Sequence, residues 1–118
     1  MAQSIHDFHD DPRNADIRIW VNGALKPRAE ATVSVFDSGF MLGDGVWEGI
    51  RVYKGRMAFL AEHLDRLWEG AKAIAMDIGI SREEMVSRLY ETIDANAMDA
   101  CHIRLMVTRG VRSTPYQD

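Results

Sequence analysis

Two-residue alternation of apolar and other side chains marks the first patterned part of the sequence. Residues 17–21 alternate in this way, which predicts a β-strand with one face turned toward a core. Asn22-Gly23 follows, and both residue types tolerate the positive φ angles of a tight hairpin turn. We therefore expect a hairpin whose return strand ends before Pro27, and a further β stretch over residues 31–36.

A longer alternation runs through residues 46–53 and predicts another strand. Its mostly apolar face also carries Glu48, which indicates either a pair with an arginine or a face that is wetter than its other residues suggest, and we expect the pair. The opposite face carries Trp47, Gly49, Arg51 and Tyr53. Lys54-Gly55 then predicts a tight turn, with residues 56–60 returning as the partner strand.

Helical spacing replaces the alternation in the second half of the chain. Apolar residues from Leu64 to Ala75 recur three and four positions apart, which is typical of an amphipathic helix. Ser81 and Glu84 open a second helix as a capping box, in which hydroxyl and carboxylate each satisfy a free backbone N–H. Residues 101–108 alternate again and predict a final strand. This order of elements predicts an α+β fold, with a largely antiparallel sheet packed on two helices.

Composition limits the classes of function. The chain has 118 residues, 47% of them hydrophobic, and a net charge of −4, which fits one globular domain and disfavours nucleic acid as a partner. No apolar run approaches the roughly 20 residues that span a bilayer, so no membrane partner is expected. Residues 1–16 are polar and lack the pattern of a signal peptide, so we expect an N-terminal arm. Cys101 is the only cysteine, and we expect a cytoplasmic protein.

Two groups of residues are candidates for chemistry. Trp47 and Arg51 flank a glycine that leaves room for a planar ligand, although such residues also suit a core or an interface. Arg66 lies near the expected start of the first long helix, where free N–H groups and a guanidinium would converge on an anion. Its alternative role is a weak surface pair with Glu62. The His, Cys and carboxylate residues show no metal-ligand spacing, so we expect no metal site.

Three segments together resemble one family. They are Val21-Asn22-Gly23, the run DSGFMLGDGVWEGIRVY over residues 37–53, and Glu62-His63-Leu64-Asp65-Arg66-Leu67. In this order and spacing they are similar to the class IV aminotransferases. That group includes branched-chain and D-amino-acid aminotransferases, R-selective amine transaminases and aminodeoxychorismate lyase. The resemblance covers about residues 17–110 in unbroken order.

The resemblance implies roles for individual residues. Arg66 would bind the phosphate of the cofactor, pyridoxal 5'-phosphate, and Trp47 would line the substrate pocket together with Arg51, Leu42 and Phe40. The implied fold is the small N-terminal α+β domain of the fold-type IV aminotransferases, within a homodimer of two-domain subunits. The implied function is transfer of an amino group between a branched-chain-like amino acid, or an amine, and a 2-keto acid.

Two departures from the family pattern change this picture. Members specific for D-amino acids carry an arginine and a histidine where this chain has Ser113-Thr114-Pro115-Tyr116, with Arg112 out of register, so branched-chain-like or amine substrates are expected. The family's Schiff-base lysine lies in the larger C-terminal domain, whereas the lysines here are Lys26, Lys54 and Lys72. We therefore expect residues 17–118 to form the N-terminal domain, with the catalytic lysine beyond Asp118 and this chain alone inactive.

Two alternatives remain open. An enzyme of the aminodeoxychorismate-lyase type uses the same scaffold and cofactor but eliminates instead of transferring. A non-catalytic α+β dimerisation or binding module would also account for the missing lysine. A lysine-bearing domain downstream would separate enzyme from module, and activity assays would then separate transferase from lyase.

Overall fold

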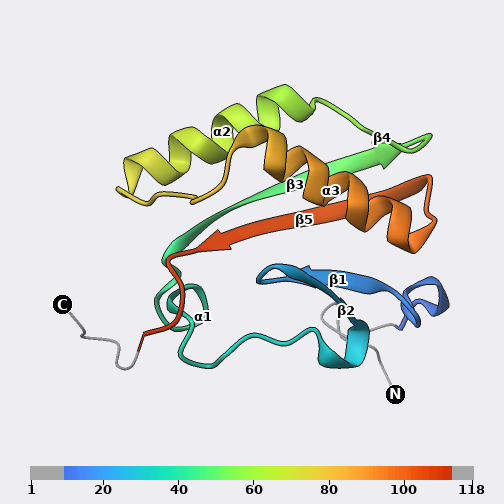
Figure 1. Cartoon of the computed structure of the whole chain (residues 1–118), viewed down its shortest axis with the longest axis horizontal. Coiled ribbons are helices and arrows are strands. Elements are labelled where there is room, and N and C mark those ends of the chain that lie inside the picture. Colours follow the sequence, from blue (N-terminus) through green and yellow to red (C-terminus); the bar gives the residue numbers. More distant parts are fainter. Residues whose placement is uncertain (1–9, 113–118) are drawn as a thin grey trace, which may run out of the picture. The chain divides into compact units, whose positions relative to one another are not determined.

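The computed structural model describes residues 10–112, and the chain divides into two compact units, residues 1–32 and 33–118. The described part of the first unit is a β-hairpin flanked by short 3-10 helices (Figure 1). Its elements are η1 (Pro12–Asn14), β1 (Arg18–Val21), β2 (Ala24–Pro27) and η2 (Arg28–Glu30). Asn22 and Gly23 have φ angles of 49° and 97°, which confirms the predicted turn. The return strand includes Pro27, contrary to the prediction, because a proline is tolerated at the end of an edge strand.

The second unit combines an antiparallel sheet with helices (Figure 1). Its elements are α1 (Ser38–Leu42), β3 (Gly45–Tyr53), β4 (Arg56–Met57), α2 (Leu60–Ala73), α3 (Arg82–Asn96) and β5 (Ala100–Thr108). The strand order is β4-β3-β5. β3 pairs with β5 along its whole length, from Gly45 opposite Thr108 to Tyr53 opposite Ala100, whereas β4 pairs only with the end of β3.

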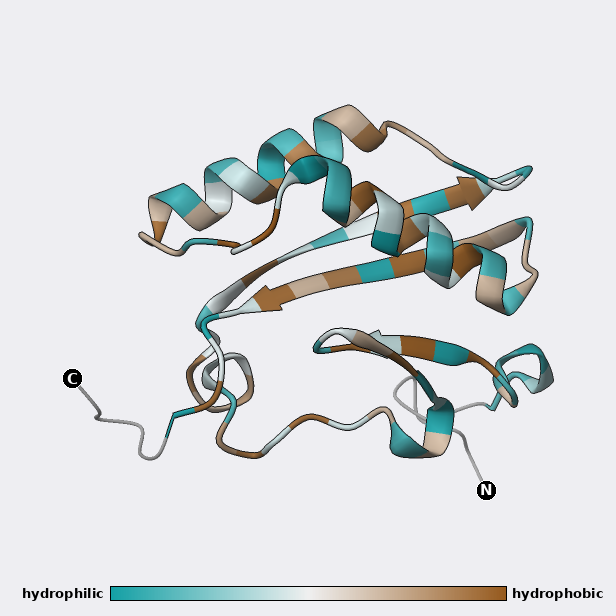
Figure 2. Cartoon of the chain, viewed as in Figure 1, coloured by the Kyte–Doolittle hydropathy of each residue, from teal (hydrophilic) through white to brown (hydrophobic). Residues whose placement is uncertain are grey.

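Both long helices cover the same face of this sheet. Ile50 and Val52 of β3 are fully buried against apolar side chains of α2 and α3, namely Leu64, Leu67, Met85, Leu89 and Ile93. Burying these side chains together is the main force that holds the layers in place. Figure 2 shows hydrophobic and hydrophilic residues interleaved along the helices and strands, as amphipathic elements require. The predicted α+β fold, an antiparallel sheet packed on two helices, is confirmed.

The predicted helix start at Ser81 is also confirmed. The Ser81 hydroxyl accepts a hydrogen bond from the backbone N–H of Glu84 at 3.0 Å. The Glu84 carboxylate accepts from Nε of Arg88 at 3.1 Å instead of completing the capping box. Among residues 10–112, no helix is long and apolar enough to cross a membrane.

Three further local predictions are wrong. Residues 31–36 lie in neither sheet, and Val33, Val35 and Phe36 are exposed, so this segment has no layer against which a strand could pack. β4 stops at Met57 instead of residue 60, because Phe59 adopts the left-handed conformation with φ 55° and ends the extended run. The third concerns residues 38–42, which form helix α1 where the sequence predicted no helix.

Candidate active site

Helix α1 places Phe40 and Leu42 on the surface of the second unit. Asp37 caps the helix, because its carboxylate accepts a hydrogen bond from the backbone N–H of Gly39 at 2.8 Å. The same carboxylate accepts from the hydroxyl of Thr108 at 3.1 Å, which ties α1 to the end of β5. Phe40 and Leu42 are 71% and 50% exposed, so both are available to a ligand or to another surface.

The outer face of the sheet carries an exposed aromatic ring and exposed cations. Trp47 and Arg51 project from β3 and Arg104 from β5, and all three are exposed. The guanidinium carbon of Arg104 lies 3.7 Å from the centroid of the Trp47 ring, a close cation–π contact. Gly49 lies opposite Arg104, and a Cβ at this glycine would come within 2.9 Å of Nε2 of His102. The glycine therefore gives the ring of His102 room to lie against β3.

On the helix side of the sheet, Glu48 is the buried partner of Arg66. The side chain of Glu48 is 5% exposed and that of Arg66 71%. Nε of Arg66 donates to Oε2 at 2.9 Å and to Oε1 at 3.1 Å, and Nη2 donates to Oε1 at 2.7 Å. This two-point contact holds the Nε–Nη2 edge, and Nη1 has no hydrogen-bond partner within residues 10–112. The expectation that Glu48 pairs with an arginine is confirmed.

His63 is the second neighbour of this carboxylate. Its Nδ1 lies 2.7 Å from Oε1 of Glu48. Hydrogen bonds from Arg66 hold the pKa of the Glu48 carboxyl below its ordinary value, although burial acts in the opposite direction. An ionised carboxylate only accepts hydrogen bonds, so the shared proton belongs to Nδ1 of His63. The hydrogen bonds to Glu48 in turn raise the pKa of the Arg66 guanidinium. The Glu48 carboxylate and the Arg66 guanidinium are therefore both charged at neutral pH.

Arg66 does not lie at the start of its helix. Helix α2 begins at Leu60, which places Arg66 in the second turn, beyond the N–H groups that a helix leaves free at its first residues. One edge of the guanidinium contacts Glu48 of the sheet, and the convergence of its other edge with those groups on an anion stays a prediction. The alternative pair with Glu62 is replaced by the pair with Glu48.

The other end of α2 is held by Arg109. Its Nε donates to Oδ2 of Asp44 at 2.7 Å. Nη1 and Nη2 donate to the carbonyl oxygens of Ala75 and Ile74, at 3.2 Å and 2.6 Å. These carbonyls lie just beyond the last residue of α2, so Arg109 stabilises the end of the helix and joins it to β5 and to the residue before β3. These contacts hold the C-terminal end of α2 against the sheet.

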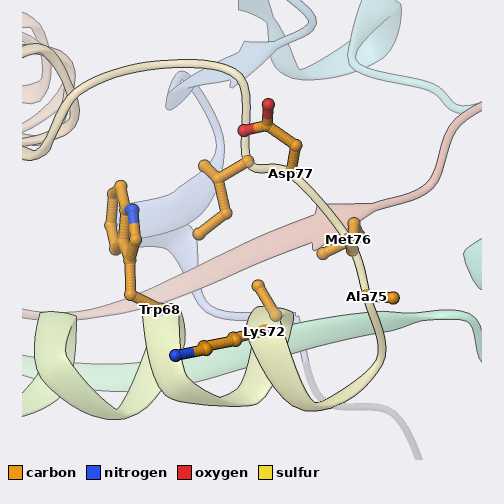
Figure 3. Close-up of a pocket in the computed structure, with 7 residues that line it drawn as sticks. Trp68, Lys72, Ala75, Met76 and Asp77 are labelled. Atoms are coloured by element: carbon orange, nitrogen blue, oxygen red, sulfur yellow. The ribbon is translucent and has the colours of Figure 1, made fainter.

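The predicted site residues lie on three parts of the second unit. Trp47 and Arg51 lie on the outer face of the sheet, Arg66 on the helix side, and Phe40 and Leu42 on α1. Figure 3 shows a shallow depression of about 300 Å³ at the C-terminal end of α2. It is lined by Trp68, Ala71, Lys72, Ala75, Met76, Asp77 and Ile78, and so by none of those five residues.

Arg104 is a candidate that sequence reasoning missed. Only the pairing of β3 with β5 places it opposite Gly49 and against Trp47. The alternation over residues 101–108 places Arg104 on the same face of its strand as His102, Met106 and Thr108. The contact with Trp47 depends on which residues of β3 and β5 lie opposite each other, and the sequence alone does not determine that register.

Most of the chain is similar in sequence to known proteins. Residues 45–117 match the family described as amino-transferase class IV. The chain is 49% identical over 104 residues to the branched-chain-amino-acid aminotransferase-like protein 1 of Arabidopsis thaliana, covering 87% of this chain and 19% of that protein. It is 38% identical over 101 residues to the D-alanine aminotransferase of Bacillus licheniformis, covering 86% of this chain and 36% of that protein.

The fold is also similar to a solved structure. This is a branched-chain amino acid aminotransferase of T.th. complexed with N-(5'-phosphopyridoxyl)-L-glutamate, with a TM-score of 0.75 and 32% identity. The match covers 83% of this chain and 34% of that chain. The chain thus spans about a fifth to about a third of the length of the proteins it matches.

Proposed function

Because the chain belongs to the class IV aminotransferase family, we propose that it forms the N-terminal part of an enzyme that transfers amino groups by means of pyridoxal 5'-phosphate. The amino donor is a branched-chain-like amino acid, or an amine, and the acceptor is a 2-keto acid. The similar structure complexed with a phosphopyridoxyl compound supports the cofactor. When bound, pyridoxal phosphate supplies the electron sink on which transamination depends.

The arrangement of Arg66 carries this proposal. A phosphate anchor has to present charged N–H donors to solvent in a fixed orientation. The Arg66 side chain is 71% exposed, and Glu48 holds one edge of its guanidinium, which leaves Nη1 to meet an anion. A guanidinium is planar and permanently charged, so this donor set fits a phosphate group. In the proposed enzyme, Arg66 binds the cofactor phosphate and α2 determines where that phosphate lies.

We propose that the outer face of the sheet contributes to the substrate pocket. Trp47 would pack against the substrate side chain, and Arg51, Leu42 and Phe40 would lie on the same wall. The support is the exposure of these side chains and the contact between Arg104 and the Trp47 ring. Exposed guanidinium groups attract the carboxylate that amino acids and 2-keto acids share, while the aromatic ring favours an apolar side chain.

The substrate, the compartment and the oligomeric state rest on the sequence and the family resemblance. Residues 113–116, where D-amino-acid-specific members carry their arginine and histidine, lie outside the described residues, as does most of the arm proposed for residues 1–16. The choice of a branched-chain-like substrate therefore rests on the sequence. A cytoplasmic homodimer with small-molecule amino and keto substrates is supported by the family resemblance and, for the compartment, by the single cysteine.

Turnover measurements test the proposed function. The 118-residue chain and a protein that joins it to a lysine-bearing C-terminal portion of the family fold are each mixed with pyridoxal phosphate, an amino donor and 2-oxoglutarate. We expect the joined protein to convert leucine to its keto acid, and the chain alone to show no turnover. Turnover by the chain alone, or elimination without amino transfer by the joined protein, would contradict the proposal.

A further inference from the structure

We propose that Glu48 is a positioning residue for the cofactor phosphate and acts through Arg66. This inference rests on the proposed function, because it takes Arg66 as the phosphate anchor. Its basis is the juxtaposition of a carboxylate that is 5% exposed with a guanidinium that is 71% exposed, joined through the Nε–Nη2 edge alone. The free side of the guanidinium is the side that a phosphate would meet.

The carboxylate itself is rigidly placed. Glu48 lies in the middle of β3, where the strand pairs with Leu105 of β5, and the next residue on the same face is the fully buried Ile50. From α2, Nδ1 of His63 holds Oε1 at 2.7 Å. Glu48 therefore lacks the freedom to follow a moving arginine, and Arg66 has to take the orientation that Glu48 sets.

This constraint has a consequence for binding. An exposed arginine otherwise samples many rotamers, and a ligand that orders it loses affinity to the entropy of that ordering. With one edge already fixed by Glu48, most of the ordering is complete before the phosphate arrives. The contact to Glu48 therefore strengthens phosphate binding, although Glu48 carries the same sign of charge as the phosphate.

The direction in which phosphate affinity changes when Glu48 is removed distinguishes a positioning role from a purely electrostatic one. If Glu48 acted only through its charge, its removal would tighten phosphate binding, because a negative neighbour repels an anion. If it positions Arg66, its removal weakens binding. Glu48→Gln keeps the shape of the side chain and removes the charge, and the exposed guanidinium remains solvated, so this variant distinguishes the two directions.

The first measurement is made on the 118-residue chain. With nitrogen-15-labelled arginine, NMR reports how fast the Nε–H of Arg66 exchanges with water. We expect slow exchange in the parent and fast exchange in Glu48→Gln. Asp65→Asn is the matched control, because it removes one carboxylate from α2 whose partner is Arg82 and not Arg66. If Glu48→Gln leaves the exchange of Arg66 Nε–H slow, Glu48 does not hold the guanidinium and the inference is wrong.

The second measurement is the dissociation constant of pyridoxal phosphate. It is made on the protein in which the 118-residue chain is joined to a lysine-bearing C-terminal portion of the family fold. We expect Glu48→Gln to weaken binding about tenfold, the loss that corresponds to ordering one free arginine side chain. Asp65→Asn should leave binding unchanged. In an Arg66→Lys background, Glu48→Gln should have no further effect, since there is no guanidinium left to position.

Each result has a distinct meaning. Tighter or unchanged binding in Glu48→Gln, with weaker binding in Arg66→Lys, would overturn the positioning role and leave the proposed function intact. Unchanged binding in Arg66→Lys would instead overturn the assignment of Arg66 and, with it, this inference. An equal loss from Glu48→Gln in the parent and in the Arg66→Lys background would show that Glu48 does not act through Arg66.

Discussion

Glu48 occupies a strand position that the alternation of β3 otherwise fills with apolar side chains. Burying a carboxylate is unfavourable unless donors replace the lost water, and Arg66 and His63 supply such donors at 2.7–3.1 Å. A pair of this kind adds little net stability, because desolvation offsets the attraction between the charges. A role in orienting Arg66 gives a physical reason for placing a charge there.

The ionisation of Glu48 predicts a pH dependence of stability. Its pKa in the folded chain lies below the ordinary value of 4.5, chiefly because of the hydrogen bonds from Arg66. The unfolded chain therefore takes up the proton first, and the contribution of Glu48 is present above pH 4.5 and is lost as the pH falls through the lowered value. We expect the free energy of unfolding in urea to decrease over this range, and to decrease less steeply in Glu48→Gln. Equal slopes for both proteins would contradict this account.

Asp44 is a second carboxylate that makes the stability of the chain sensitive to acid. Hydrogen bonding to Arg109 also lowers its pKa, so Glu48→Gln should reduce the acid sensitivity of the chain without abolishing it.

The sequence predicted that Glu48 needs an arginine but not which one. The partner lies 18 positions away on another element, and only the packing of α2 on β3 brings the two together.

Among the elements, β3 carries residues of the proposed site on both of its faces. Glu48, the partner of Arg66, lies on the helix side, and Trp47 and Arg51 lie on the outer face. Two glycines of β3 approach neighbours of different kinds. A Cβ at Gly45 would lie 2.6 Å from the backbone oxygen of Val107. A Cβ at Gly49 would come closest to the ring of His102, with Nε2 at 2.9 Å. A backbone oxygen within a ladder cannot move aside, whereas an exposed ring can.

Alanine substitutions at these glycines should therefore differ in their effect. We expect Gly45→Ala to destabilise the chain by about 1–3 kcal/mol, the usual range for forcing extra atoms into a packed site. Gly49→Ala should stay within about 0.5 kcal/mol of the parent, as surface substitutions usually do. Urea unfolding of both variants provides the measurement. A larger loss from Gly49→Ala than from Gly45→Ala would show that the ring of His102 is fixed against β3.

Elements with a strong period were predictable, and those set by distant contacts were not. The hairpin at Asn22-Gly23, the long strands and both long helices follow from alternation, helical spacing and the cap at Ser81. Helix α1 has five residues, too few for a periodic signal, and depends on contacts of Asp37 and Ser38 with Thr108 and Gly110. The contact of Arg104 with Trp47 escaped prediction for the same reason, because it requires the pairing of β3 with β5.

At the scale of the whole molecule, the outer face of the sheet is apolar as well as cationic. Trp47, Tyr53 and Met106 are 54%, 60% and 60% exposed. Trp47 and Met106 pair directly across β3 and β5, whereas Tyr53 lies at the other end of β3. Exposed apolar side chains on a sheet face are typical of an interaction surface. Contacts between the domains of one enzyme commonly bury ~600–1,500 Å², and we expect Trp47 and Tyr53 to belong to such a contact in the proposed enzyme.

The isolated chain should then self-associate through this face. We expect sedimentation at high concentration to show dimers or larger species, and Tyr53→Lys to shift the chain toward monomer. Val33→Lys is the control, since Val33 is 61% exposed but lies outside β3 and β5. A strictly monomeric parent chain, or equal effects of the two substitutions, would contradict the role of this face.

In the proposed enzyme, Arg66 anchors the phosphate of pyridoxal phosphate. The most direct test is the dissociation constant of the cofactor, measured for the variants Arg66→Lys and Arg51→Lys. Both variants are made in the protein that joins the 118-residue chain to a lysine-bearing C-terminal portion of the family fold. Lysine keeps the charge but loses the planar set of donors, so we expect Arg66→Lys to bind the cofactor about tenfold more weakly, a loss of about 1.4 kcal/mol. Arg51→Lys should change substrate handling and leave cofactor affinity near that of the parent. Tight binding by Arg66→Lys together with weak binding by Arg51→Lys would show that the two arginines have been assigned the wrong way round.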